Sequence, residues 1–309
     1  MKSIITGGAG FIGSHLCDLL LSKGHEVVCV DNLITGSVKN IEHIKSDDFT
    51  YVQHDVTKPF HYAGEVDYVF HLASPATFKM CVEAPTAFMK VNSEGTFNML
   101  EFAKEKQARF LLASTSEVYG DPLVNPQSEA YWGNVSCTGP RSVYDEAKRF
   151  AESITMTYYR YCGVDTRIVR IFNTYGPRMQ IKDSRVIPNF VNQALSGDDI
   201  TIYGDGSYTR SFCYATDEAE GIYRLMMSDC AEPVNIGNEH EMTILELAKM
   251  ILGVTGSKSK IIHKDSLTDD PKLRCPDISR AKNVLSWEPK VGLEEGLTNT
   301  VEYFKSVRV

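Results

Sequence analysis

Tyr144 and Lys148 are spaced Tyr-x-x-x-Lys, which is a spacing that could support proton transfer. Residues four apart lie on one face of a helix, so both side chains can point into the same site. A tyrosine has an ordinary pKa near 10, and a phenolate near neutrality needs a depression of roughly 3 units, or about 4 kcal/mol. One positive charge about 4 Å away supplies energy of that order in a partly screened site. The pair is therefore a candidate base for redox chemistry on an alcohol carbon, the alternative being an ordinary surface helix pair.

A glycine turn near the N-terminus could bind the cofactor for such chemistry. Gly7, Gly10 and Gly13 form a G-x-x-G-x-x-G pattern between an apolar run and a helical pattern. Glycines let the backbone turn tightly and approach a pyrophosphate, which the N-terminus of the following helix attracts. This context favours a dinucleotide site, and a dinucleotide could accept a hydride while Tyr144 takes the proton. We expect its cationic nicotinamide ring and Lys148 together to lower the pKa of Tyr144. The residues expected to contact the cofactor here are Gly7, Gly10, Phe11, Ile12 and Gly13.

Asp31 follows Gly13 by 18 residues and ends the second apolar run. A carboxylate at this place hydrogen-bonds the ribose hydroxyls of an adenosine, whereas it would repel a 2′-phosphate. No arginine follows in residues 32–35. We therefore expect NAD, with Asp31 and Asn32 at its ribose; the alternative is an ordinary acid at a strand end.

Two further strand ends could contribute to the cofactor site. Asp55 and Val56 follow the third apolar run, where they could touch the adenine, although a turn residue is an equally good reading of Asp55. Ala73 ends the fourth run, where a small side chain lets the backbone approach the cofactor. His71 fits a packed core histidine better than a ligand.

Polar residues follow the fifth apolar run as well. Thr115 and Ser116 offer hydroxyls to a substrate oxygen and to Tyr144, and Glu117 offers a carboxylate beside the reacting carbon. The ends of parallel strands line the ligand crevice of a doubly wound sheet. The alternative for Glu117 is an acid at a helix start, which the helix dipole favours.

Alternating strands and helices must position these groups. Near-continuous apolar runs indicate parallel strands buried on both faces, and helical patterns lie between them. The pattern predicts a doubly wound, Rossmann-type α/β parallel sheet. The expected strands are residues 3–6, 26–30, 49–53, 68–72, 110–113 and 166–171, and the expected helices are residues 14–22, 85–106 and 144–161.

The pattern changes after Pro177. Helices are expected over residues 187–195, 243–254 and 293–304, separated by loops that contain glycine and proline. We predict an NAD-binding domain over residues 1–177 and a smaller α/β region, mainly for substrate, over residues 178–309. A segment near residues 208–236 is expected to return to the main sheet, with its strand and helix at residues 213–227.

Composition excludes several other classes of protein. The 309 residues carry a net charge of −8, which argues against a nucleic-acid binder. There is no secretory pattern at the N-terminus and no apolar run of the roughly 20 residues that a membrane span needs. The eight cysteines are scattered without a Cys-x-x-Cys pair, and the eight histidines lack metal-ligand spacing. We expect a cytoplasmic protein with reduced thiols and no metal.

These residues resemble a known family over nearly the whole chain. The chain is similar to the extended short-chain dehydrogenase/reductases that act on nucleotide sugars, and most of all to the UDP-glucuronate decarboxylase family. One departure lies in residues 77–81 (TFKMC), where that family tends to have a proline-containing segment. The stretches that carry the resemblance are residues 71–76 (HLASPA), 112–122 (LASTSEVYGDP), 126–133 (PQSEAYWG), 139–149 (GPRSVYDEAKR), 170–179 (RIFNTYGPRM) and 287–289 (WEP).

The resemblance also suggests how a nucleotide sugar is held. It implies that Arg210 and Asn173 contact the diphosphate and that Arg274 lies near the sugar carboxylate. Arg185 is a further phosphate candidate, because the planar guanidinium binds two oxygens at once. Tyr203 is expected near the base. The alternative for each arginine is a solvated surface charge.

The implied reaction is the NAD-dependent conversion of UDP-glucuronate to UDP-xylose through a 4-keto sugar, with the cofactor recycled internally. Three other readings remain open: a nucleotide-sugar 4-epimerase, a nucleotide-hexose 4,6-dehydratase, and a non-catalytic NAD-binding protein of the same fold. UDP and dTDP are not distinguished. Relatives pair the helices that correspond to residues 85–106 and 144–161, so a homodimer is expected.

Overall fold

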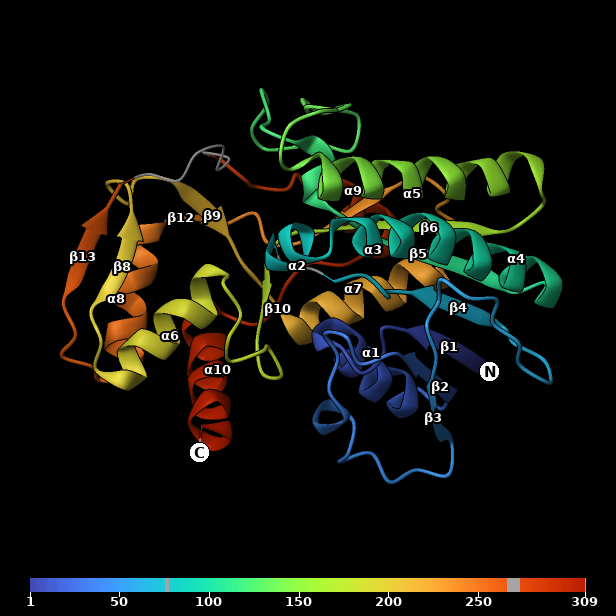
Figure 1. The fold of residues 1–309 in the computed structure, drawn as a ribbon, viewed down its shortest axis with the longest axis horizontal. Helices are drawn as coiled ribbons and strands as arrows, with labels where there is room; N and C mark the ends of the chain where they lie inside the picture. The colour runs from blue at the N-terminus through green and yellow to red at the C-terminus, as the bar shows by residue number, and fades with distance from the viewer. Residues whose placement is uncertain (76–77, 266–272, 309) are drawn as a thin grey trace.

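The computed structural model describes residues 1–75, 78–265 and 273–308. Its centre is a seven-stranded sheet in which every neighbouring pair is parallel. The strand order is β3-β2-β1-β4-β5-β6-β11, so the direction of winding reverses between β1 and β4 (Figure 1). The predicted doubly wound sheet is therefore confirmed. Its strands are β1 (Lys2–Thr6), β2 (Glu26–Asp31), β3 (Phe49–Gln53), β4 (Tyr68–His71), β5 (Arg109–Thr115), β6 (Thr166–Ile171) and β11 (Val234–Ile236).

Helices cover both faces of the sheet (Figure 1). On one face, α1 (Phe11–Ser22) and α7 (Ala215–Met227) pack together over an apolar core that includes Leu16, Leu20 and Leu225. On the other face, α4 (Thr96–Lys106) and α5 (Ser142–Tyr161) enclose a second core that includes Met99 and Ile154. Burial on both faces explains why the strands read as continuous apolar runs.

The expected single helix over residues 85–106 is interrupted, which corrects the prediction. It consists of α3 (Pro85–Lys90), a π-helical turn η2 (Val91–Gly95) and α4, and α2 (Phe78–Glu83) precedes it. The side chains of Asn92 and Thr96 bond the carbonyl oxygens four residues earlier, at 3.0 and 2.8 Å. Such side chains compete with the helical hydrogen bonds, and π turns occur where the regular pattern is disturbed.

The segment that returns to the sheet also differs from its prediction. The helix α7 lies where it was expected, but the strand before it, β10 (Cys213–Tyr214), pairs with β7 (Thr174–Tyr175) in a separate two-stranded sheet. The strand that joins the main sheet is β11, beside β6. With only three residues, β11 is too short to show a periodic pattern.

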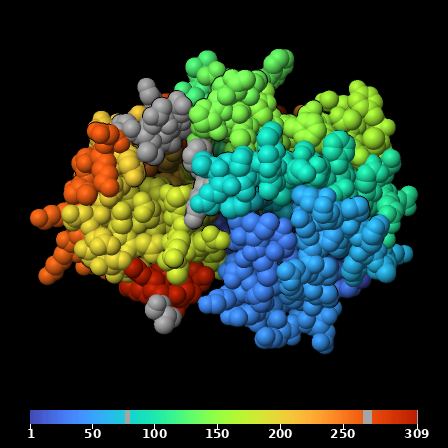
Figure 2. All heavy atoms as spheres, viewed as in Figure 1, coloured from blue at the N-terminus to red at the C-terminus, as the bar shows by residue number. Residues whose placement is uncertain are grey.

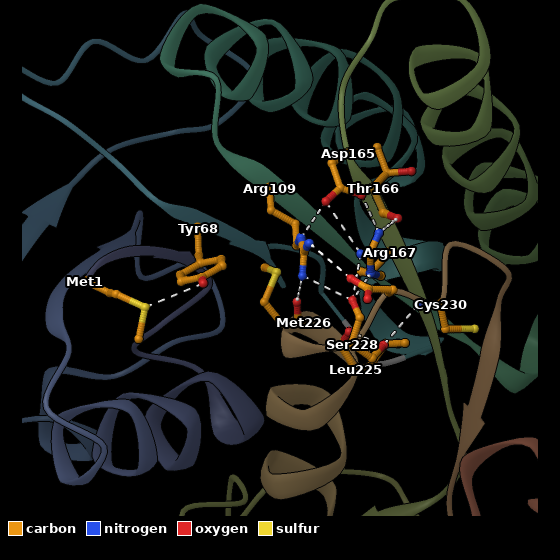
Figure 3. Close-up of polar contacts among 11 residues, drawn as sticks. Met1, Tyr68, Arg109, Asp165, Thr166, Arg167, Leu225, Met226, Ser228 and Cys230 are labelled. Carbon is orange, nitrogen blue, oxygen red and sulfur yellow. Dashed lines mark hydrogen bonds and ion pairs between the residues drawn. The ribbon is translucent and has the colours of Figure 1, made fainter. Parts of the chain in front are cut away.

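Two arginines fix the end of α7 at the edge of the sheet opposite the carboxyl ends of the strands (Figure 3). Arg109 donates to the carbonyl oxygen of Met226 at 2.9 Å, and buried Arg167 donates to that of Ser228 at 2.6 Å. Asp165 lies 2.6 Å from Arg109 and 2.5 Å from Arg167. Cations at a helix C-terminus satisfy its unpaired carbonyl groups and oppose its dipole. This cluster therefore supports the fold at a distance from the crevice.

The C-terminal half builds a further apolar core, separate from the two that flank the sheet. It includes Phe190, Ile202, Leu247 and Phe304. Figure 2 shows this part, coloured yellow to red, against the blue-to-green N-terminal part. Its helices are α6 (Val186–Ser196), α8 (Ile244–Thr255) and α10 (Leu293–Val307), and its strand pairs are β8 (Ile200–Tyr203) with β13 (Ile261–Lys264) and β9 (Thr209–Ser211) with β12 (Glu241–Thr243). The remaining elements are η1 (Val38–Asn40), η3 (Ser116–Tyr119) and α9 (Ser279–Leu285).

No helix within the described ranges combines the length and apolar character needed to cross a bilayer. Among those same residues, no three His, Cys, Asp or Glu side chains gather as a metal site would require. The proposed boundary at residue 177 remains a prediction.

Candidate active site

A cleft of about 1040 Å³ opens at the carboxyl ends of the strands and is lined by both parts of the chain. The reversal of winding between β1 and β4 creates a crevice at this edge, where doubly wound sheets bind their ligands. All the sequence-predicted site residues except Asp55 line the cleft. Residues far apart in the sequence are thus brought into one cavity.

The glycine turn leaves no room for side chains. Gly7 has a φ of +71°, and a Cβ placed there would lie 2.8 Å from the carbonyl carbon of Leu72. A Cβ on Gly13 would lie 2.1 Å from the carbonyl oxygen of Gly7, so glycine is needed for α1 to start this close to β1. The turn presents the N-terminus of α1, with Gly10 as its N-cap, to the cleft.

Asp31 ends β2 on the cleft wall. Its two carboxylate oxygens accept the backbone N–H groups of Leu33 at 2.8 Å and Ala9 at 3.1 Å. Burial raises the pKa of Asp31, and these hydrogen bonds oppose the shift. The bare backbone of the turn and a buried carboxylate at the end of β2 fit a dinucleotide, with the pyrophosphate at α1 and the ribose at Asp31.

Asp55 does not line the cleft, and its contact with the adenine stays a prediction. Its carboxylate accepts the N–H of Thr57 at 2.9 Å, and its carbonyl oxygen accepts the N–H of Lys58. These bonds make it the turn residue that the alternative reading described, since Asp commonly caps a turn in this way. Its neighbour Val56 does line the cleft, as do Asn32 and Ala73.

Tyr144 and Lys148 lie in the first turns of α5, with Tyr144 facing the cleft and its ring 5.2 Å from that of Phe88. Burial raises the pKa of Tyr144 to about 12, against the effect of a hydrogen bond with Thr115. In the protein alone, losing water costs the phenolate more than the nearby charges return. The expected depression also needs the positive charge of the nicotinamide ring, so it stays a prediction.

Lys148 is buried, and its ammonium group donates to the carbonyl oxygen of Ala113 at 3.0 Å. Burial lowers the pKa of Lys148 to about 8, and Glu152, one turn further along α5, opposes this shift. Glu152 is itself held by Arg170 at 2.7 Å and by the hydroxyl of Ser114 at 2.5 Å. The lysine is thus fixed at the end of β5, beside the tyrosine.

Glu117 is the second residue of the turn η3 after β5, and it lies between two arginines. One carboxylate oxygen is 2.7 Å from Arg274 and the other is 2.6 Å from Arg141. Burial alone would raise the pKa of Glu117, but the two guanidinium groups hold it below its ordinary value. The carboxylate is therefore ionised at neutral pH, so it accepts hydrogen bonds and does not act as an acid.

Two members of this cluster were missed from the sequence. Arg141 precedes α5 and also lies 4.0 Å from Asp145. Asp145 is buried, and one of its oxygens has no hydrogen-bond partner among the residues described. Burial and then the charge of Glu117 raise the pKa of Asp145 to about 7. Both residues lie in the stretch that carries the family resemblance, which was the available signal.

The predicted substrate residues line the other side of the cleft. Arg210 is buried on β9, Asn173 follows β6, and Tyr203 is exposed at the end of β8. Arg185 is held by Asp183 at 2.6 Å, which partly neutralises it, and lies 5.9 Å above the ring of Phe11. Ser116 is buried at the start of η3.

The departure at residues 77–81 falls partly outside the described residues, because Thr77 is not among them. Cys81, at its end, is buried on the cleft wall and packs with Phe88 and Ala147. Burial raises the pKa of its thiol to about 11. The cysteine therefore contributes an uncharged surface near Tyr144.

The parallel sheet, the glycine turn and the Tyr144–Lys148 pair together define an NAD-dependent short-chain dehydrogenase/reductase of the extended type. The model of the GDP-mannose 4,6 dehydratase family matches residues 4–300. UDP-glucuronic acid decarboxylase 1 of Xenopus tropicalis is 50% identical over 305 residues, which cover 98% of this chain and 72% of that protein. The chain belongs to the UDP-glucuronic acid decarboxylase family within this group.

Solved structures of related enzymes share the fold. UDP-glucose 4-epimerase of Thermotoga maritima, solved with UDP-glucose, superposes with a TM-score of 0.89 at 31% identity, covering 99% of each chain. UDP-glucuronic acid 4-epimerase of Bacillus cereus, solved with UDP-glucuronic acid and NAD, gives a TM-score of 0.86 at 28% identity, covering 100% of each chain. These structures show that the fold holds a UDP-sugar in both related proteins and NAD in the second of them.

Proposed function

We propose that this protein converts UDP-glucuronate to UDP-xylose and CO2, using NAD that is regenerated in each cycle. One observation carries the proposal: Tyr144, Glu117 and Arg274 meet in a single cleft of a chain that is half identical to UDP-glucuronic acid decarboxylases. Epimerases of the same fold are less similar, at 31% and 28% identity. The decarboxylase reading is therefore favoured.

Bound NAD supplies a hydride acceptor for C4 of the sugar and later returns the hydride. Tyr144 supplies the matching proton transfer at the C4 hydroxyl. Because burial keeps its phenol protonated in the protein alone, its proton is released only when further positive charge stands beside it. Buried Lys148 already holds one positive charge at the end of β5, and the nicotinamide ring of bound NAD would supply the further one.

Oxidation at C4 makes the carboxylate on C5 β to a ketone, and such an acid loses CO2 because the electrons flow into an enolate. Thr115 and Tyr144 are hydrogen-bonded neighbours that can donate to the developing oxyanion. Arg274 is placed to bind the carboxylate before it leaves. Ionised Glu117 can orient the water that reprotonates C5, since it is an acceptor and not an acid.

The nucleotide part is assigned to the C-terminal side of the cleft. Arg210 and Asn173 are proposed to hold the diphosphate, and Tyr203 to pack near the base. Arg185 is a weaker candidate for the diphosphate, because Asp183 already occupies its guanidinium group.

The test is product identification. Purified protein incubated with UDP-glucuronate and NAD should release CO2 in proportion to UDP-xylose, as followed by gas measurement and NMR. Formation of UDP-galacturonate without CO2 would instead assign a 4-epimerase. A 4-keto-6-deoxy product from an uncharged nucleotide-hexose would assign a dehydratase.

Two further proposals concern the protein as a whole. A homodimer is supported by apolar side chains that remain exposed on the α3–α5 face, namely Met89, Phe97 and Phe150. A cytoplasmic location is supported by the scattered cysteines and the acidic composition. Analytical ultracentrifugation and fractionation of cells that express the protein test these two proposals.

A further inference from the structure

The stretch 126–133 helped to place the chain in its family, but the mechanism above gives it no role. It lies in the loop between η3 and α5, shown in green above α5 in Figure 1. Loop residues are usually exposed, yet Gln127 is 1% exposed. A buried amide needs hydrogen-bond partners, so its contacts indicate what the residue does.

The backbone of Gln127 is bonded on both sides of Pro276. Its backbone N–H donates to the carbonyl oxygen of Cys275 at 2.8 Å, and its carbonyl oxygen accepts the N–H of Asp277 at 2.9 Å. Its side-chain oxygen accepts the N–H of Cys275 at 3.0 Å. The two segments, 148 residues apart in the sequence, are thus paired like neighbouring strands.

The orientation of the Gln127 side-chain amide follows from the contacts of its NH2 group. Its NH2 group donates to the carbonyl oxygen of Val124 at 2.8 Å and to the side-chain oxygen of Asn125 at 3.1 Å. Because both of these partners are acceptors, the nitrogen must face them and the oxygen must face Cys275. The side chain therefore has one favoured orientation.

Arg274 immediately precedes Cys275 and extends its guanidinium group to Glu117 at 2.7 Å. Glu117, the other member of this ion pair, lies in the turn η3 together with Tyr119. The hydroxyl of Tyr119 donates to the side-chain oxygen of Asn235 at 2.8 Å. Asn235 in turn donates to the carbonyl oxygen of Gln127 at 3.0 Å. Gln127 is thus bonded directly to the residue after Arg274, and it is connected through Asn235 and Tyr119 to the turn that carries Glu117.

We propose that Gln127 is a positioning residue that sets the place of Arg274 and thereby the affinity for the sugar carboxylate. This inference rests on the proposed function. A guanidinium group recognises a carboxylate through two directed hydrogen bonds, so a small displacement of its backbone weakens recognition. Misplacement by about 1 Å can cost roughly 10²-fold in a positioned site.

The test compares two ligands that differ in the carboxylate. Equilibrium binding of UDP-glucuronate and of UDP-xylose is measured for the wild type, Gln127→Met and Gln127→Glu. The methionine has a similar shape and removes all hydrogen bonds of the side chain, whereas the glutamate keeps the acceptor toward Cys275. We expect Gln127→Met to weaken the binding of UDP-glucuronate about tenfold or more and the binding of UDP-xylose less than about twofold. Gln127→Glu should show the same preference with a smaller loss of UDP-glucuronate affinity.

A double-mutant cycle separates positioning from general damage. In an Arg274→Met background, Gln127→Met should cause no further loss of UDP-glucuronate affinity. The inference is overturned if the affinities for both ligands fall equally, so that a folded Gln127 variant keeps the wild-type ratio of affinities. It is also overturned if the losses of UDP-glucuronate affinity from the Gln127 and Arg274 substitutions simply add. Wild-type protein that neither binds nor converts UDP-glucuronate would instead refute the proposed function. Exposed Gln53→Met controls for the substitution itself.

Discussion

Glu117 and Arg274 form an ion pair of 2.7 Å inside the cleft, with both side chains nearly buried at 13% and 12% exposure. They lie far apart in the sequence, and Arg141 holds the second oxygen of the same carboxylate. A substrate carboxylate that binds Arg274 must share that guanidinium group with Glu117. The protein therefore balances substrate affinity against the placement of its own carboxylate.

Glu117→Gln should separate binding from turnover. Removing the charge frees Arg274 for the substrate, so we expect KM for UDP-glucuronate to fall severalfold. At the same time kcat should fall about 10²-fold or more, because the acceptor that orients the reprotonating water is weakened. Steady-state CO2 release measures both constants. An unchanged kcat would remove Glu117 from the reaction.

Tyr144→Phe should lower kcat about 10³-fold while leaving affinity for UDP-xylose nearly unchanged. The variant loses the only oxygen of the side chain that could exchange the C4 proton, but keeps the ring that packs on Phe88. Exposed Tyr161→Phe is the matched control and should retain full activity. If Tyr144→Phe keeps wild-type turnover, another group is the base.

Gly13→Ala should abolish retention of NAD. Its Cβ would meet the carbonyl oxygen of Gly7 at 2.1 Å, which forces α1 away from the turn. Gly253→Ala provides the control, because a Cβ placed there meets no neighbouring atom of the described residues within 4 Å and α8 favours alanine. Absorbance of bound nucleotide after gel filtration gives the comparison, and equal retention by both variants would disprove the proposed role of the turn.

Asp145 should make stability depend on pH. Its pKa is raised from 3.8 to about 7, so the folded state holds a proton that the unfolded state has lost. The stabilisation from the neutral form is complete below about pH 4 and disappears as the pH rises through 7. Asp145→Asn mimics the neutral form, and its free energy of unfolding should exceed that of the wild type at pH 8 by about 2 kcal/mol.

Urea unfolding at pH 4.5 and pH 8 measures this difference, with exposed Asp121→Asn as the control. The advantage of Asp145→Asn should shrink at the lower pH. An equal difference at both values would show that Asp145 does not titrate between them.

Arg167→Met should destabilise the fold without affecting the chemistry. The change removes a buried guanidinium group from the carbonyl oxygen of Ser228 and the carboxylate of Asp165, which keep only their bonds from Arg109, at a cost of about 2 kcal/mol. Exposed Arg160→Met should cost about 0.5 kcal/mol or less. Thermal unfolding gives the stability, and kcat of the folded fraction at low temperature should equal that of the wild type.

The sequence predicted well those parts of the site that depend on local spacing. The glycine turn, Asp31 at the end of β2 and the pair on α5 each lie within one strand-helix unit, so a short pattern indicates both the element and the direction of its side chains. All six strands predicted for the sheet are present for a similar reason, since several of them are near-continuous apolar runs.

What the sequence did not predict depends on contacts between distant segments. The bonds from Gln127 to Cys275 span 148 residues, and no spacing rule joins these two positions. The pKa of Tyr144 in the protein alone is raised chiefly by burial, which is a property of the assembled cleft and follows from no spacing rule. Asp55 could be read two ways: its bond to Thr57 makes it a turn residue, and its contact with the adenine stays a prediction.

The most direct test of the central claim uses UDP-glucuronate labelled with deuterium at C4. If oxidation at C4 precedes loss of CO2 and the hydride is returned to the same carbon, the UDP-xylose formed by the wild type will keep the deuterium at C4. CO2 will appear in equal amount, with NAD present only in catalytic quantity. UDP-xylose without deuterium, or UDP-galacturonate formed with no CO2, would contradict the account.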